Sequence, residues 1–154
     1  MKLFLVFICI VNSFFGGVNI ERLTDCFDKV SSLFIYNDGK KYLLESGSDK
    51  FKRVIKAVKE DTYYCHEMPE FGVDGEKVDE NGINKGLWVE LCFEKIYKHL
   101  GFDFDSLLFE IKTNSFDVDI IRKVNGKIAG QCFYLSLDNS LKKLYYAISD
   151  ILNE

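Results

Sequence analysis

An Asn125-Gly126 pair joins two runs of alternating residues that together span Ser115 to Leu137. A two-residue type I′ turn needs a positive φ at both central positions, and Asn-Gly adopts it readily. With this pair as the turn, residues equidistant from it face one another, so Phe116 faces Leu135, Val118 faces Phe133 and Ile120 faces Gln131. This register gathers the apolar residues on one face of a β-hairpin: Phe116, Val118, Phe133 and Leu135.

The remaining chain shows both helical and strand patterns. Apolar residues recur at helical spacing in Ile20–Val30, Ser48–Glu60 and Asn139–Leu152, and Asp138 to Ser140 form an N-cap for the last of these. Strand patterns fall in Ser32–Tyr36, Lys41–Glu45, Gly86–Glu94 and Phe104–Ile111, although the last can also begin as a helical turn. In Gly86–Glu94 the alternation places Leu87, Val89, Leu91 and Phe93 on a buried face, and Trp88, Glu90 and Cys92 on the outer face.

Size and composition favour one α+β domain. The chain has 154 residues, 47% of them apolar, and a single proline, with no low-complexity tract that would mark a boundary. We predict a single antiparallel sheet of about five to six strands built from hairpins, with about two to three helices packed on one face. The formal charge of −4 argues against a nucleic-acid partner.

Residues 1–17 form an apolar leader, and residues 18–154 form the predicted domain. Lys2 precedes nine unbroken apolar residues, Leu3–Val11, and Asn12-Ser13 follows, a pattern that resembles a signal peptide. The run is too short to span a bilayer as a helix, and a buried first strand would have the same composition. The leader predicts an exported or membrane-anchored protein, in contact with a membrane only if the leader is uncleaved, and a cytoplasmic protein is the alternative.

Loss of the leader would remove Cys9 and leave an even set of cysteines, Cys26, Cys65, Cys92 and Cys132, which is compatible with two disulfides. None of them forms a CxxC pair. Cys92 and Cys132 fall within predicted strands, where a cysteine often behaves as a small buried apolar residue. We therefore favour thiols over a bridge at these two positions.

One side of the Ser48–Glu60 helix is basic and carries Lys50, Lys52, Arg53, Lys56 and Lys59. Such a row could bind phosphate or an anionic lipid, but a solvated helix face is the simpler interpretation in an acidic domain. The acidic residues of Asp61–Gly82 are expected to neutralise the row.

The segment Asp61–Gly86 is predicted to be irregular, because Pro69 disfavours helix at Met68 and glycines recur at turn spacing. Long irregular connections in compact domains are often functional. We therefore take Met68, Phe71, Trp88 and Glu90 as candidate binding residues, with the Met68–Gly86 loop and the exposed side of Trp88 presented to a protein partner.

Three sequence blocks occur in order along the chain: Met68–Val73 (MPEFGV), Gly86–Leu91 (GLWVEL) and Gln131–Leu135 (QCFYL). They resemble the MPxFGV-like, GxWxE-like and CFYL-like blocks of a family of small uncharacterised bacterial proteins. The resemblance covers about Leu33 to Leu152 and implies no particular activity.

Patterns for catalysis and metal binding are weak. A thiol–imidazole pair could come only from Cys92 or Cys65 with His99 or His66, and no activating motif surrounds any of them. Asp74–Gly82 lacks the order of an EF-hand loop, which leaves at most a weak calcium site. No catalytic residue, metal ligand or cofactor is predicted.

The leading prediction is a small binding or interaction domain without enzymatic activity. Its alternatives are an enzyme that uses Cys92 or Cys65 with a histidine, and a purely structural cytosolic protein.

Overall fold

The computed structural model describes residues 16–63, 65–71, 78–79, 82–83, 85–137 and 140–154. The elements in chain order are β1 (Val18–Asn19), the 3₁₀ helix η1 (Leu23–Lys29), β2 (Val30–Asn37), β3 (Lys40–Leu44), α1 (Asp49–Asp61), β4 (Cys65–Phe71), β5 (Val78–Asp79), β6 (Gly82–Ile83), β7 (Leu87–His99), β8 (Phe102–Glu110), β9 (Asp117–Val124), β10 (Lys127–Leu137) and α2 (Lys142–Asn153).

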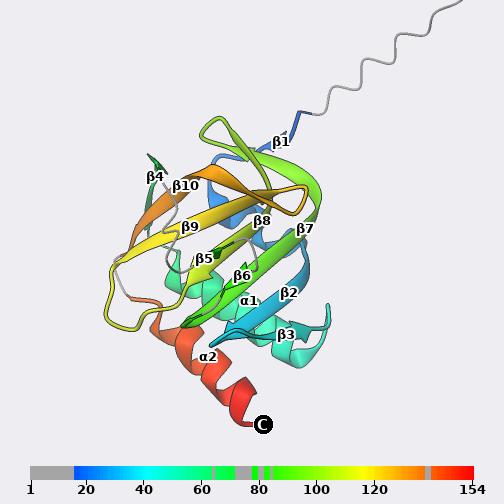
Figure 1. Cartoon of the computed structure of the whole chain (residues 1–154), viewed down its shortest axis with the longest axis vertical. Coiled ribbons are helices and arrows are strands. Elements are labelled where there is room, and N and C mark those ends of the chain that lie inside the picture. The colour runs from blue at the N-terminus through cyan, green and yellow to red at the C-terminus, as the bar shows by residue number, and fades with distance from the viewer. Residues whose placement is uncertain (1–15, 64, 72–77, 80–81, 84, 138–139) are drawn as a thin grey trace, which may run out of the picture.

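One curved sheet organises the fold (Figure 1). Its strands follow the order β3-β2-β7-β8-β9-β10-β4, each antiparallel to its neighbour, and β1 adds a short parallel pairing to β7. β5 and β6 form a separate two-stranded hairpin. The predicted α+β class and antiparallel sheet are confirmed.

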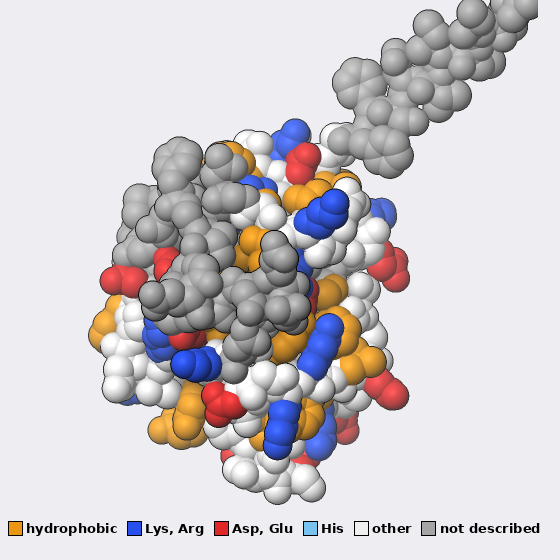
Figure 2. Space-filling view, in the orientation of Figure 1, with side chains coloured by type: hydrophobic (Ala, Val, Ile, Leu, Met, Phe, Trp, Pro, Cys, Tyr) orange, Lys and Arg blue, Asp and Glu red, His pale blue; other side chains and the backbone are white. Residues whose placement is uncertain are grey.

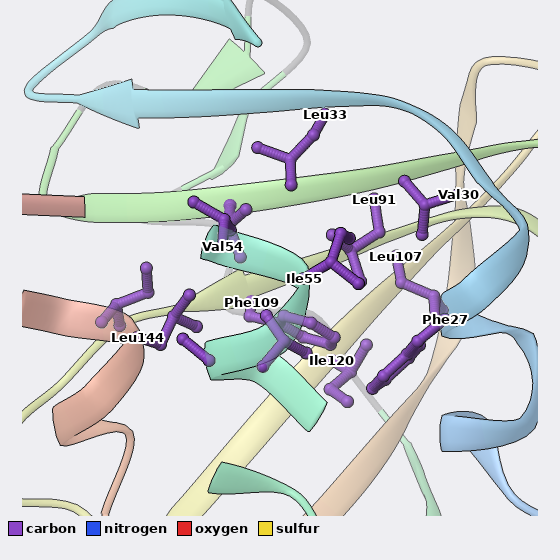
Figure 3. Close-up of a cluster of buried hydrophobic side chains, with 14 of the residues drawn as sticks. Phe27, Val30, Leu33, Val54, Ile55, Leu91, Leu107, Phe109, Ile120 and Leu144 are labelled. Carbon is purple, nitrogen blue, oxygen red and sulfur yellow. The ribbon is translucent and has the colours of Figure 1, made fainter. Parts of the chain in front are cut away.

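The helices cover one face of the sheet and enclose the main core (Figure 3). The apolar stripe of α1, which includes Val54 and Ile55, packs over sheet residues such as Leu91 and Phe109. Ser48 begins α1 as predicted, because its hydroxyl accepts a hydrogen bond from the amide of Phe51 at 3.2 Å. The Ile20–Val30 helix is also present, as the 3₁₀ helix η1.

The β9–β10 hairpin turns at Asn125-Gly126, where φ is 52° and 74°. The predicted register holds only next to the turn. An irregularity after Ile128 shifts the pairing of the two strands by two residues, so Val118 faces Leu135 instead of Phe133. A two-residue shift keeps every side chain on its own face, so Val118, Ile120, Phe133 and Leu135 are buried as expected. Phe116 lies before β9 and is 56% exposed, so its predicted place in the core is wrong.

The segment after α1 was predicted to be irregular, but it contains β4, which forms a sheet edge beside β10. Pro69 has no amide hydrogen to donate, and an edge strand tolerates it because one side of its backbone needs no partner.

The N-terminus of α2 is capped from another helix. The Asp61 carboxylate, at the end of α1, accepts a hydrogen bond from the Leu144 amide at 2.9 Å. The N-cap residue of α2 is Leu141, whose side chain makes no capping hydrogen bond; of the cap predicted at Asp138 to Ser140, residues 138 and 139 lie outside the described residues. At the other end, Glu154 pairs with Lys50 and Arg53 of α1, each at 3.0 Å, which makes the two helices antiparallel.

Candidate binding site

Two of the predicted binding residues, Met68 and Phe71, lie on β4, where their backbones pair with Tyr134 and Gln131 of β10. They therefore belong to a strand and not to an irregular loop. Their side chains lie outside the described residues, as do most of the Met68–Gly86 loop and the candidate calcium segment.

Trp88 lies on the sheet face opposite the main core, as the alternation in β7 predicted, but it is only 3% exposed. It packs in a second cluster, here called the outer cluster, with Tyr36, Ile83, Leu108 and Ile121. Its indole nitrogen donates to the Lys85 carbonyl at 2.9 Å. The predicted exposure of Trp88 is wrong because Ile83 of β6 folds back over this face of the sheet.

Glu90 is 4% exposed beside the outer cluster. Its carboxylate accepts hydrogen bonds from the Tyr36 hydroxyl at 2.5 Å, the Ser106 hydroxyl at 2.7 Å and the Lys123 ammonium at 2.8 Å. Burial alone would raise the pKa of Glu90, but the three donors outweigh it and the pKa lies below its usual range. Glu90 is thus fully engaged by its neighbours, which fits an internal anchor better than a ligand contact.

Of the alternative thiol–imidazole pairs, Cys92–His99 conflicts with the geometry, and the side chains of Cys65 and His66 lie outside the described residues. Cys92 lies beside Ser106 on the face that carries Glu90, whereas the His99 ring packs 5.1 Å from the ring of Phe133, in the main core. Burial, and then the Glu90 charge, raise the pKa of the Cys92 thiol, which is the opposite of what a nucleophile needs. Cys26 and Cys92 carry thiols, whereas the side chain of Cys132 lies outside the described residues.

A hollow of about 770 Å³ lies on the helical side of the molecule, along α1. Its floor is apolar and consists of Phe27, Val30, Phe51 and Ile55, while Tyr63, which is 60% exposed, stands at the end of α1. Four lysines and two acids form the rest of the lining: Lys52, Lys56, Lys59, Lys143, Asp28 and Glu60. We call this hollow the α1 groove. Its volume is typical of ligand sites.

The lysines of the α1 groove form ion pairs of unequal length with nearby acids. Lys59 donates to both carboxylate oxygens of Asp28 at 2.8 Å, and Lys143 donates to Glu60 at 3.0 Å. The hydrogen bond from Lys143 holds the pKa of Glu60 below its usual range. Lys52 and Lys56 reach acids of their own helix only at 3.9 and 3.8 Å. These two lysines are therefore the easiest to recruit.

The sequence identified this basic row but not the groove beside it. The sequence feature that indicates the groove is the position of Lys52, Lys56 and Lys59 next to the apolar stripe of α1. The residues that η1 contributes, Phe27 and Asp28, reach the groove only through tertiary packing. The acidic segment Asp61–Gly82 was expected to neutralise the row. Among the described residues its partners are Asp28, Asp49, Glu60 and Glu154, and most acidic side chains of that segment lie outside the described residues.

The face shown in Figure 2 presents interspersed basic and acidic side chains in its described part.

Among the described residues no helix is long and apolar enough to cross a bilayer. In the same part of the chain no group of three His, Cys, Asp or Glu side chains is placed to hold a metal ion.

No family model matches the chain, and no curated protein matches it. Its fold is similar to the crystal structure of YycH from Bacillus subtilis, with a TM-score of 0.52 and 12% sequence identity. The alignment covers 90% of this chain and 40% of the YycH chain, so the chain spans less than half the length of that protein. At this identity the similarity establishes the fold alone.

Proposed function

We propose that this protein is a non-enzymatic binding domain and that it recognises its partner through the α1 groove. The observation that carries the proposal is a hollow of about 770 Å³ with an apolar floor and a rim of four lysines. The apolar floor keeps water away from one side of the ligand, and the charged rim selects and orients the ligand.

The chemistry of the remaining candidates supports a binding role over catalysis. The buried Glu90 carboxylate accepts hydrogen bonds from three neighbouring side chains. Cys92 has a raised pKa and lies on the other face of the sheet from His99. The similarity to part of the longer YycH chain also supports a domain of this size acting as one module.

The proposal includes export through the leader of residues 1–17, whose Leu3–Val11 run resembles the apolar core of a signal peptide. The intact mass of the protein made in its native host tests this part. A mass lacking the leader supports export with cleavage, and a full-length mass in a soluble cytoplasmic fraction contradicts it. Membership of the small bacterial family stays a prediction from the three sequence blocks.

The groove itself is tested with an amphiphilic anion, 8-anilinonaphthalene-1-sulfonate, in titrations followed by ¹⁵N–¹H correlation spectra. We expect saturable shifts confined to amides around α1 and η1. In the Lys52→Glu/Lys56→Glu variant, affinity should fall about tenfold, which corresponds to about 1.4 kcal/mol.

The matched control is Lys95→Glu/Lys127→Glu, which changes the net charge equally at two exposed lysines away from the groove. It should bind the probe like the wild type. Shifts outside the α1 groove, or equal affinity in all three proteins, would refute the proposed site.

A further inference from the structure

We infer that the natural occupant of the α1 groove is an acidic amphipathic helix of a protein partner, lying along α1. The inference rests on the proposed function and adds the chemical class of the ligand.

The spacing of the rim is the first step. Lys52, Lys56 and Lys59 stand four and three residues apart on α1, so they form one row on the helix surface. At 1.5 Å per residue the row is about 10 Å long. A ligand that matches it needs several negative groups at the same repeat, which acidic side chains on one stripe of a helix provide.

The floor is the second step. Phe51 and Ile55 lie one helical turn apart and line the groove beside the lysine row, and Phe27 of η1 belongs to the same apolar floor. An apolar strip that runs parallel to a charged strip is complementary to a helix with adjacent apolar and acidic stripes.

The strength of the existing ion pairs is the third step. Lys52 and Lys56 have side chains that are 67% and 77% exposed, and their nearest acids lie 3.9 and 3.8 Å away. Exposed pairs of this kind contribute little, so a partner's carboxylates can replace them at small cost. Lys59 keeps Asp28 as a close partner, which fixes one wall of the groove.

The same features disfavour an anionic membrane or a single small anion. A bilayer surface cannot enter a concave hollow. One isolated anion would engage only part of a row about 10 Å long.

The test uses the full chain and a synthetic helical peptide of about five turns, with Glu at positions i, i+4 and i+7 and Leu along the adjacent stripe. Binding is measured by calorimetry and by amide shift mapping. We expect one peptide per chain, with shifts around α1 and η1. A peptide with Gln in place of Glu, and a peptide of identical composition with the stripes scrambled, should each bind at least tenfold more weakly.

A charge-swap experiment separates specific pairing from general attraction. The Lys52→Glu/Lys56→Glu variant should lose the acidic peptide and gain affinity for a matched peptide with Lys at the three Glu positions. The Lys95→Glu/Lys127→Glu control should keep the preference of the wild type. Equal binding of the Glu and Gln peptides would overturn the inference.

Two further outcomes distinguish this inference from the proposed function. If the sulfonate probe occupies the groove but the acidic peptide does not bind, the helix is wrong and the site stands. If vesicles of phosphatidylglycerol and phosphatidylcholine bind with the same dependence on Lys52 and Lys56 while the peptide does not, the occupant is a lipid surface. If neither probe nor peptide binds, both proposals fail.

Discussion

Replacement of Glu90 should destabilise the domain more than replacement of any exposed acid. Glu90→Leu removes the acceptor of three donors and leaves the Tyr36 and Ser106 hydroxyls without it in a buried site. An unsatisfied buried hydroxyl costs about 1 to 3 kcal/mol. Lys123 is 20% exposed at its side chain and can turn to water. We therefore expect a loss of about 3 to 5 kcal/mol.

Glu90→Gln fills the same space and still offers hydrogen-bonding groups, but it loses the charge that strengthens them. Charge-assisted hydrogen bonds are about twice as strong as neutral ones, so the loss should be about 1 to 2 kcal/mol. Asp28→Asn is the control, because Asp28 is 67% exposed in its pair with Lys59, and it should cost less than about 1 kcal/mol. Urea unfolding followed by circular dichroism measures all three.

The pH dependence of these variants provides an independent check. The pKa of Glu90 is lowered in the folded state, so its stabilisation is present above the unfolded value of about 4.3 and is lost as pH falls through the folded value. The difference between wild type and Glu90→Gln should therefore be constant from about pH 6 to 8 and shrink in acid. A difference that does not change with pH, or a Leu variant no worse than the Gln variant, would refute the network.

Three other predictions follow from single contacts. Asp61→Ala should lower the free energy of unfolding by about 1 to 2 kcal/mol because it removes the cap of α2, whereas Asp61→Asn keeps a carbonyl acceptor for the Leu144 amide. Burial raises the pKa of Asp61, so the wild type should gain stability relative to the Asn variant as pH falls. Urea titrations from pH 7 to 3 measure this difference. Gly17→Ala would place a Cβ 2.8 Å from the Tyr97 carbonyl carbon. Hydrogen exchange should then show loss of protection at the Ile20 amide, which donates to the Lys98 carbonyl at 2.9 Å. In the control Gly16→Ala the new Cβ has nothing within 4 Å, so the Ile20 amide should stay protected. Cys92, with its raised pKa, should resist iodoacetamide at pH 7 in the folded protein and react in urea; rapid labelling of the native thiol would reinstate the enzyme alternative.

The strands that alternate clearly could be predicted from sequence. The faces of β7 and β9 are right because successive side chains of a strand point to opposite faces of the sheet, although both faces of β7 prove to be buried around Trp88 to Leu91. The pairing shift in β10 left no trace in this pattern, since a two-residue offset preserves the alternation. β4 was not predicted because Cys65–Phe71 lacks an alternation of apolar and polar residues and contains a proline. An edge strand can form without that alternation and tolerates the proline.

The candidate site depended more on tertiary structure. The alternation placed Trp88 on the correct face, but the pattern of one strand cannot reveal that Ile83, from another element, covers that face. The basic row on α1 was visible, yet its neighbours Phe27 and Asp28 come from η1, which approaches only in the folded chain. Local patterns thus located the parts, and long-range packing determined which of them lie open to a ligand.

The burial of Trp88 also equips the protein with an internal optical reporter. It is the single tryptophan of the chain and lies in the outer cluster, across the sheet from the α1 groove. The fluorescence emission of Trp88 should change when Ile83 separates from the sheet, and it should not change when a ligand binds in the α1 groove. Comparing this emission with far-ultraviolet circular dichroism during unfolding would therefore show whether the two sides of the sheet open together or in sequence.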